Sequence, residues 1–100
     1  MTIVVTREAQ RDLQDCFVFY DQQDSGVGEV FLSEIREHLR ALRDCAGIHA
    51  KRFGKHRMLV GRFPHAIYYD VTGERVIVQA VADCRMDPGR IEVRVRQDDL

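Results

Sequence analysis

The spacing of the apolar residues changes once along this chain, and that change limits the folds it can adopt. Up to about residue 46, apolar side chains recur every three or four positions, which is the spacing of an amphipathic helix. From Arg57 to Asp83 they alternate or run continuously, as they do in β-strands. A chain of 100 residues with 45% apolar side chains can bury one core between two layers of secondary structure. We therefore expect one α+β domain spanning residues 1–100.

The first half of the sequence predicts a short strand followed by a helical hairpin. A β-branched run, Ile3–Val5, precedes Thr6, whose hydroxyl suits a helix N-cap. The apolar stripes predict one helix over Arg7–Asp21 and a second that begins at Val27 and ends near residue 46. Gly28 lies inside the second helix, where glycine costs about 1 kcal/mol relative to alanine. We expect it to permit close approach of the first helix.

The second half predicts a curved, mainly antiparallel sheet of three to four strands. Candidate strands cover Arg57–Val60, His65–Val71 and Arg75–Asp83, and a Thr-Gly turn makes the last two a hairpin. Arg75–Asp83 is apolar on both faces, so we place it at the centre of the sheet. The strict alternation of Ile91–Arg96 predicts a fourth strand at an edge. The helices should pack on one face, leaving the other face and its groove for binding.

Positive charge is concentrated in the middle of the chain, although the formal net charge is only -1. Such a segment suits phosphate or an acidic partner, but the acidic remainder argues against broad binding of nucleic acid. We accordingly expect no direct sequence-specific binding of DNA. Residues 47–69 contain no acid, and the cations of this candidate binding segment are Lys51, Arg52, Lys55, Arg57 and Arg62.

The sequence indicates no membrane span, no disulfide framework and no metal site. No apolar run approaches the roughly 20 residues that span a bilayer, and the first residues do not resemble a signal peptide, so we expect a cytoplasmic protein. Cys16, Cys45 and Cys84 are too scattered for a disulfide framework. Cys45 and His49 lie four residues apart, but no further ligand cluster accompanies them. We expect neither a metal nor another cofactor.

Three segments of the sequence resemble the RelE/ParE toxin superfamily, which includes the toxins of plasmid stabilisation systems. Thr6–Tyr20 is similar to the opening helix of these toxins. Arg57–Tyr69 looks like the family's arginine, strand, aromatic-proline pair and strand ending in tyrosine. Val78–Pro88 is similar to the apolar strand that precedes a His-x-Arg-Arg-x-Pro ending. The resemblance implies the toxin of a type II toxin-antitoxin system, neutralised by a cognate antitoxin that lays a folding segment along it.

The departures from this pattern bear on the chemistry. Asp83 stands where many relatives have histidine, and no aromatic residue or histidine follows Tyr69. The family's ribosome-dependent ribonucleases depend on such a late side chain near the scissile phosphate. In a ribonuclease, only His65, Asp83 and His56 remain as plausible proton-transfer groups, with Arg85 joining Arg57 and the other cations at the phosphate. The ordinary alternatives are a strand histidine at position 65 and an acidic partner for Arg85 at position 83.

Three functions are compatible with these residues, and whether the chain is an enzyme stays open. We favour a ParE-like toxin that inhibits growth by binding DNA gyrase, because an obvious acid-base set is missing. The first alternative is a RelE-like endoribonuclease that cuts mRNA on the ribosome. The second is a degenerate, non-toxic family member that only binds antitoxin.

Overall fold

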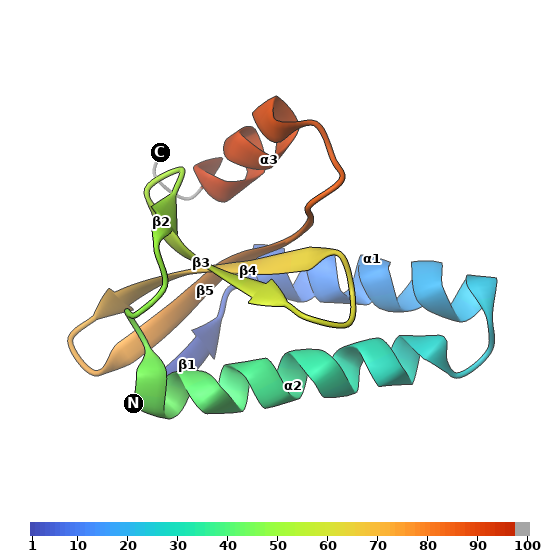
Figure 1. Cartoon of the computed structure of the whole chain (residues 1–100), viewed down its shortest axis with the longest axis horizontal. Helices are drawn as coiled ribbons and strands as arrows, with labels where there is room; N and C mark the ends of the chain where they lie inside the picture. The colour runs from blue at the N-terminus through green and yellow to red at the C-terminus, as the bar shows by residue number, and fades with distance from the viewer. Residues whose placement is uncertain (98–100) are drawn as a thin grey trace.

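A computed structural model describes residues 1–97 as a mixed β-sheet with helices on both of its faces (Figure 1). Within that range, no helix is long and apolar enough to cross a membrane. The sequence positions of the elements set the α+β class: one strand, two helices, four strands and a last helix. In chain order they are β1 (Thr2–Val5), α1 (Arg7–Gln23), α2 (Val27–Cys45), β2 (Lys51–Arg52), β3 (Lys55–Val60), β4 (His65–Thr72), β5 (Arg75–Asp83) and α3 (Pro88–Val95).

The predicted helical hairpin is confirmed, and two residues explain its geometry. The Thr6 hydroxyl caps α1 by accepting a hydrogen bond from the backbone N–H of Ala9, at 3.2 Å. Gly28 sits against the ring and backbone of Phe17, and a Cβ at this position would lie 2.8 Å from the Phe17 carbonyl oxygen. Since no real Cβ approaches a backbone oxygen that closely, glycine is what allows α1 and α2 to pack at this distance.

The sheet has the strand order β1-β5-β4-β3-β2. β1 runs parallel to β5, and the other neighbours are antiparallel. β5 is an interior strand that pairs with both β1 and β4, as its apolar faces predict, although the central position belongs to β4. A register shift between Tyr68 and Tyr69 marks a bulge in the β4–β5 pairing. Both tyrosine side chains are buried, on opposite faces of the sheet.

The predicted edge strand over Ile91–Arg96 is wrong, because these residues belong mainly to helix α3. Asp87 caps this helix through its side chain, and Pro88 occupies the first turn, where a missing N–H costs nothing. Ile91 and Val95, four residues apart, then fall on one side of the helix and are buried. An alternating apolar pattern over six residues also contains this i, i+4 pair, so the spacing alone did not distinguish helix from strand.

Helix α3 changes the predicted layering, because it covers the sheet face that was expected to be open. The hairpin face is the side that packs against α1 and α2, and its core includes Phe31, Ile35, Leu42, Ile67 and Tyr69. The α3 face is the opposite side, where α3 closes over a cluster of small and aromatic side chains. That cluster consists of Ala66, Tyr68, Ala80, Ala82, Ile91 and Val95.

Candidate functional site

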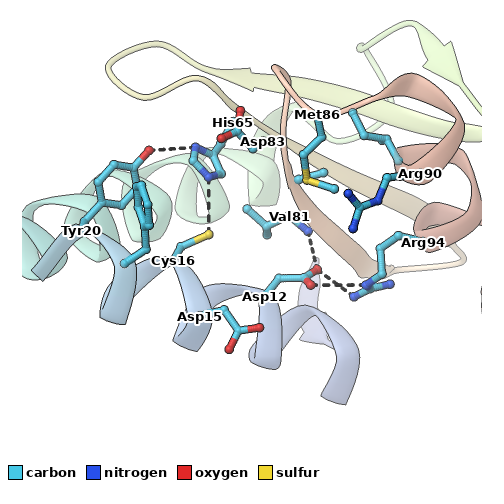
Figure 2. Close-up of a pocket in the computed structure, with 13 residues that line it drawn as sticks. Asp12, Asp15, Cys16, Tyr20, His65, Val81, Asp83, Met86, Arg90 and Arg94 are labelled. Atoms are coloured by element: carbon cyan, nitrogen blue, oxygen red, sulfur yellow. Dashed lines mark hydrogen bonds and ion pairs between the residues drawn. The ribbon is translucent and has the colours of Figure 1, made fainter. Parts of the chain in front are cut away.

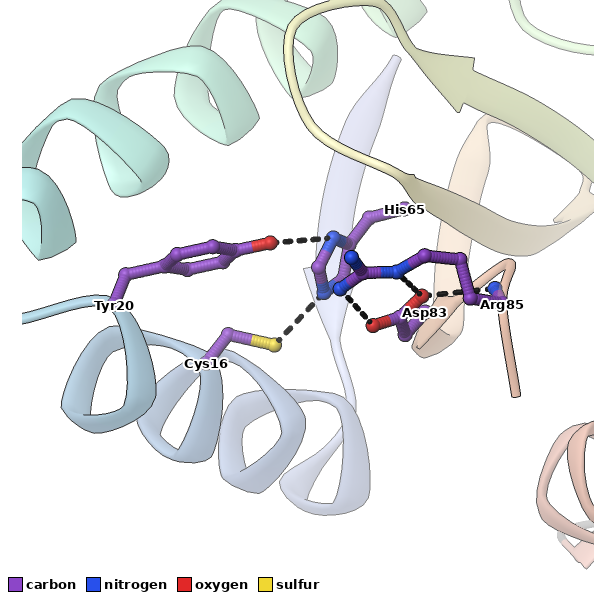
Figure 3. Close-up of polar contacts among 5 residues, drawn as sticks. All are labelled: Cys16, Tyr20, His65, Asp83 and Arg85. Atoms are coloured by element: carbon purple, nitrogen blue, oxygen red, sulfur yellow. Dashed lines mark hydrogen bonds and ion pairs between the residues drawn. The ribbon is translucent and has the colours of Figure 1, made fainter. Parts of the chain in front are cut away.

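Two of the three predicted proton-transfer residues lie side by side where β4 begins and β5 ends, whereas His56 lies on β3, with its Nδ1 2.7 Å from the His49 carbonyl oxygen. His65 and Asp83 are register partners across these strands. The His65 ring points toward α1, where its Nε2 lies 3.4 Å from the Cys16 Sγ and its Nδ1 lies 3.4 Å from the Tyr20 hydroxyl (Figure 3). Arg85, just after β5, completes the group by contacting Asp83. The structure therefore brings together three of the predicted residues with two from α1.

His65 is packed as a core side chain. It is only 4% exposed, and its ring contacts the aromatic rings of Tyr20 and Phe31. Burial lowers the pKa of His65 below its usual value of 6.5, because desolvation penalises the charged imidazolium. Burial also raises the pKa of the Cys16 thiol to about 12, so the neighbouring sulfur is a neutral thiol and not a nucleophilic thiolate at neutral pH. The side chains of His65, Cys16 and Tyr20 thus form a neutral, hydrogen-bonded part of the core.

Asp83 is held by Arg85 in a two-point contact. Its carboxylate accepts from the Arg85 Nε at 3.0 Å and from Nη2 at 2.8 Å, and it also accepts from the Arg85 backbone N–H at 2.8 Å. The hydrogen bonds from Arg85 hold the pKa of Asp83 below its usual value of 3.8. A carboxylate bound in this way is a weak base, which agrees with the alternative role of Asp83 as a partner for Arg85.

The predicted cations do not form one surface. Lys51 and Arg52 are exposed on β2, at one end of the sheet order. Lys55 is only 6% exposed, and its ammonium lies 3.1 Å from the Asp70 carboxylate. Arg62 follows β3, and its Nη1 lies 3.7 Å from the Glu34 Oε1 of α2. The cations of the acid-free segment 47–69 are thus divided between the edge strand β2, the interior and the far end of β3.

Arg57 lies on the opposite face from His65. Its Nε donates to the Tyr68 hydroxyl at 3.2 Å, and its Nη2 lies 3.5 Å from the Cys84 Sγ. Tyr68 belongs to the cluster beneath α3, whereas His65 contacts Phe31 of the hairpin face. A single phosphate therefore cannot meet the His65 ring and the Arg57 guanidinium in this arrangement.

Potential metal ligands are likewise engaged elsewhere. Among residues 1–97, no three His, Cys, Asp or Glu side chains come together in a way that could hold a metal ion. The Cys45 thiol donates to the Ala41 carbonyl oxygen at 3.1 Å. The His49 Nδ1 lies 2.6 Å from the Tyr69 hydroxyl. The first contact is internal to α2, and the second links the loop after α2 to β4.

A pocket of about 430 Å³ opens between α1, the end of β5 and α3 (Figure 2). At one end are His65 and Cys16, and at the other an ion pair joins Arg94 of α3 to Asp12 of α1, with 2.7 Å between Nη2 and Oδ2. Asp12 also accepts from the backbone N–H of Val81, at 2.9 Å. The pocket depends on α3 being a helix, so the strand prediction for these residues concealed it.

Comparison with known proteins decides the family. A model of the ParE toxin of the type II toxin-antitoxin system parDE matches residues 3–88. This chain belongs to the ParE toxin family. A solved chain of the chromosomal ParDE toxin-antitoxin system from P. aeruginosa has the same fold, with a TM-score of 0.74 and 20% identity. The similarity covers 83% of this chain and 95% of that one. No curated protein sequence matches the chain.

The family assignment confirms the resemblance to the RelE/ParE superfamily and places the chain in its ParE branch. The residues that sequence reasoning missed are Cys16 and Tyr20, which contact His65, and the Asp12–Arg94 pair. Cys16 and Tyr20 are four residues apart in the apolar stripe of α1, so that spacing indicates that both face the sheet. No local signal pairs Asp12 with Arg94, because 82 residues separate them.

Proposed function

We propose that this ParE-family toxin inhibits growth in the cytoplasm by binding DNA gyrase, and that a cognate antitoxin neutralises it. The observation that carries the proposal is the separation of the groups that RNA cleavage needs. His65 is buried on the hairpin face, Asp83 is bound by Arg85, and Arg57 faces α3. Cleavage requires a base, a cation and an acid around one phosphate, so this arrangement favours action by contact.

A binding toxin and a ribonuclease respond differently to loss of the carboxylate at position 83. Removing a general acid or base lowers a reaction rate by roughly 10²- to 10⁴-fold. If Asp83 only positions Arg85, then Asp83→Asn retains the shape of the side chain and its contact with the guanidinium. We therefore expect this variant to inhibit growth to within about threefold of the wild type, since a surface ion pair contributes about 0–1 kcal/mol.

The direct test uses purified toxin in two assays. In the first, supercoiling by DNA gyrase should be inhibited by the toxin, and the inhibition should disappear when the product of the adjacent reading frame is added. In the second, mRNA on translating ribosomes should remain uncut. Specific cuts in the ribosomal A site that are lost in Asp83→Asn would overturn the proposal and favour the ribonuclease. Normal growth on induction, with neither activity present, would instead favour the non-toxic alternative.

A further inference from the structure

The outer edge of β1 presents unpaired backbone groups. The N–H of Thr2 donates to the Glu74 carbonyl oxygen at 2.8 Å, and the N–H of Thr6 donates to the Val78 carbonyl oxygen at 3.1 Å. Since alternate residues of a strand direct these groups to opposite sides, the backbone N–H and C=O groups of Ile3 and Val5 point away from β5.

Only one of these four outward groups is occupied within residues 1–97. The Val5 carbonyl oxygen accepts from the side-chain Nε2 of Gln10, at 3.0 Å. β1 is the first strand of the sheet order and pairs with β5 alone. The N–H and C=O of Ile3 and the N–H of Val5 are therefore available to another strand.

β1 and α2 lie next to each other in the fold (Figure 1). A groove of about 310 Å³ is lined by residues of β1 and of the second half of α2. Its floor is apolar, formed by Ile3, Val5 and Leu39, all of them partly exposed. Its other lining residues in the described part of the chain are Arg36, Arg40 and Arg43, and none of these is acidic. The groove thus joins an apolar strip, a cationic rim and an open strand edge.

The three arginines form a stripe on α2, at positions i, i+4 and i+7. Like charges at this spacing destabilise a helix by about 0.2–0.5 kcal/mol per pair. Within residues 1–97, the stripe forms one ion pair, between Arg36 Nη1 and Glu29 Oε2 at 4.0 Å, and both of these side chains are exposed. The stripe is therefore largely uncompensated in the free chain, and an anionic partner would relieve the repulsion.

We propose that β1 and this groove receive an extended segment of the antitoxin, whose every second residue faces α2 and whose residues on that side include both apolar and acidic ones. The inference rests on the proposed function, because it names how the neutralising partner binds. A strand added about 4.8 Å from β1 would take up the three free backbone groups. Its side chains on the hairpin side would then alternate along the groove, meeting Leu39 and the arginines. This surface is distinct from the basic segment over residues 51–62 that the sequence predicted.

Amide hydrogen exchange tests the strand pairing, with an internal control in the same strand. In the free toxin, the amides of Ile3 and Val5 should exchange rapidly, whereas that of Thr6 should be protected by Val78. On binding the product of the adjacent reading frame, the amides of Ile3 and Val5 should slow by at least about tenfold through new backbone hydrogen bonds. A complex in which both amides still exchange rapidly would overturn the strand pairing.

Charge reversal tests the arginines against a matched pair of exposed cations. The triple variant Arg36→Glu, Arg40→Glu, Arg43→Glu should weaken the complex by at least about tenfold, and more so at low salt. Lys51→Glu with Arg52→Glu should change it by less than about threefold, because those side chains lie on β2, at the other end of the sheet order. Equal losses in the two variants, or none in the triple variant, would overturn the proposed groove. The triple neutralisation to Gln checks that any loss does not arise from misfolding.

These outcomes separate the inference from the proposed function. If the product of the adjacent reading frame binds and neutralises the toxin but ignores both β1 and the arginines, only the location of the interface is wrong. If no complex forms with the wild-type toxin, neutralisation itself fails, and the inference fails with it.

Discussion

The two faces of the sheet are covered in different ways. On the hairpin face, two helices of 17 and 19 residues bury large side chains, including Phe31, Leu42 and Tyr69. On the α3 face, one helix of eight residues lies over alanines at positions 66, 80 and 82. Small side chains allow close approach of α3 but remove little apolar surface from water. The hairpin face should therefore carry most of the stability, while α3 depends on a few specific contacts.

This difference has a consequence for binding. An isolated helix of eight residues is too short to be stable in water, so α3 depends on Ile91, Val95 and the pair between Arg94 and Asp12. The pocket between α1 and α3 lies along this weaker boundary. The groove beside β1 lies instead on the strongly packed hairpin side, where a partner would meet a preformed surface.

The largest effect should come from truncating the hairpin core. Phe31 is fully buried, and its ring contacts those of Tyr20, Phe63 and His65. Phe31→Ala should lower the free energy of unfolding by about 3–5 kcal/mol, because it removes an aromatic ring and leaves a cavity. Chemical denaturation measures the change. A loss below about 1 kcal/mol would mean that the hairpin face is not the main core.

An intermediate effect should follow from breaking the contact that ties α3 to α1. Asp12→Ala removes the acceptor of both Arg94 and the Val81 N–H, leaving buried donors unpaired at a cost of about 1–3 kcal/mol. The loss should be local, with faster amide exchange in α3 and little change in α2. Asp15→Ala is the control, since this exposed residue of α1 should change stability by less than about 0.5 kcal/mol.

The same pair allows a sharper test of the α3 face. Burial is the largest influence on Asp12 and raises its pKa, despite the opposing hydrogen bonds from Val81 and Arg94. One nitrogen of Arg94, Nη1, is buried and has no hydrogen-bond partner among residues 1–97. Replacing both partners with apolar residues, as in Asp12→Leu with Arg94→Met, should therefore restore much of the stability lost in Asp12→Ala. A further loss in the double variant would show that the pair itself stabilises α3.

The sequence predicted the hairpin face better than the α3 face, and the reason is periodicity. The stripes of α1 and α2 extend over four or more turns, long enough to identify a helix and its buried side. Gly28 was correctly assigned to close helix packing, because a helix-interior glycine needs a steric reason. In α3, two turns are too short to separate a helical from an alternating pattern, and only the Asp87–Pro88 cap favoured the helix.

The candidate site was harder to predict, because it depends on which face each side chain occupies. Counting charge along the chain grouped Lys55, Arg57 and Arg62, which the fold separates. The same count hid the arginine stripe of α2, since acidic residues of the same helix offset it. Counting at helical spacing instead would have revealed Arg36 and Arg40 on one side.

The smallest effect should be the pH dependence contributed by His65, which again contrasts the buried hairpin face with its surroundings. Burial is the largest cause of its lowered pKa, with Arg85 lowering it further and Asp83 opposing both. Between the lowered pKa and the usual value of 6.5, the unfolded chain binds more protons than the folded one. This contribution to stability is therefore present above pH 6.5 and is lost as the pH falls through that window.

The variant His65→Phe tests this pH dependence. It places an apolar ring that cannot titrate beside Tyr20 and Phe31, so the stability of the variant should fall less over the same pH range. Denaturation midpoints at several pH values above 4 measure the difference, because Asp83, whose pKa lies below 3.8, stays ionised there. Parallel curves for the wild type and the variant would mean that His65 takes up a proton in the folded state as readily as in the unfolded chain, which its packing among aromatic rings opposes.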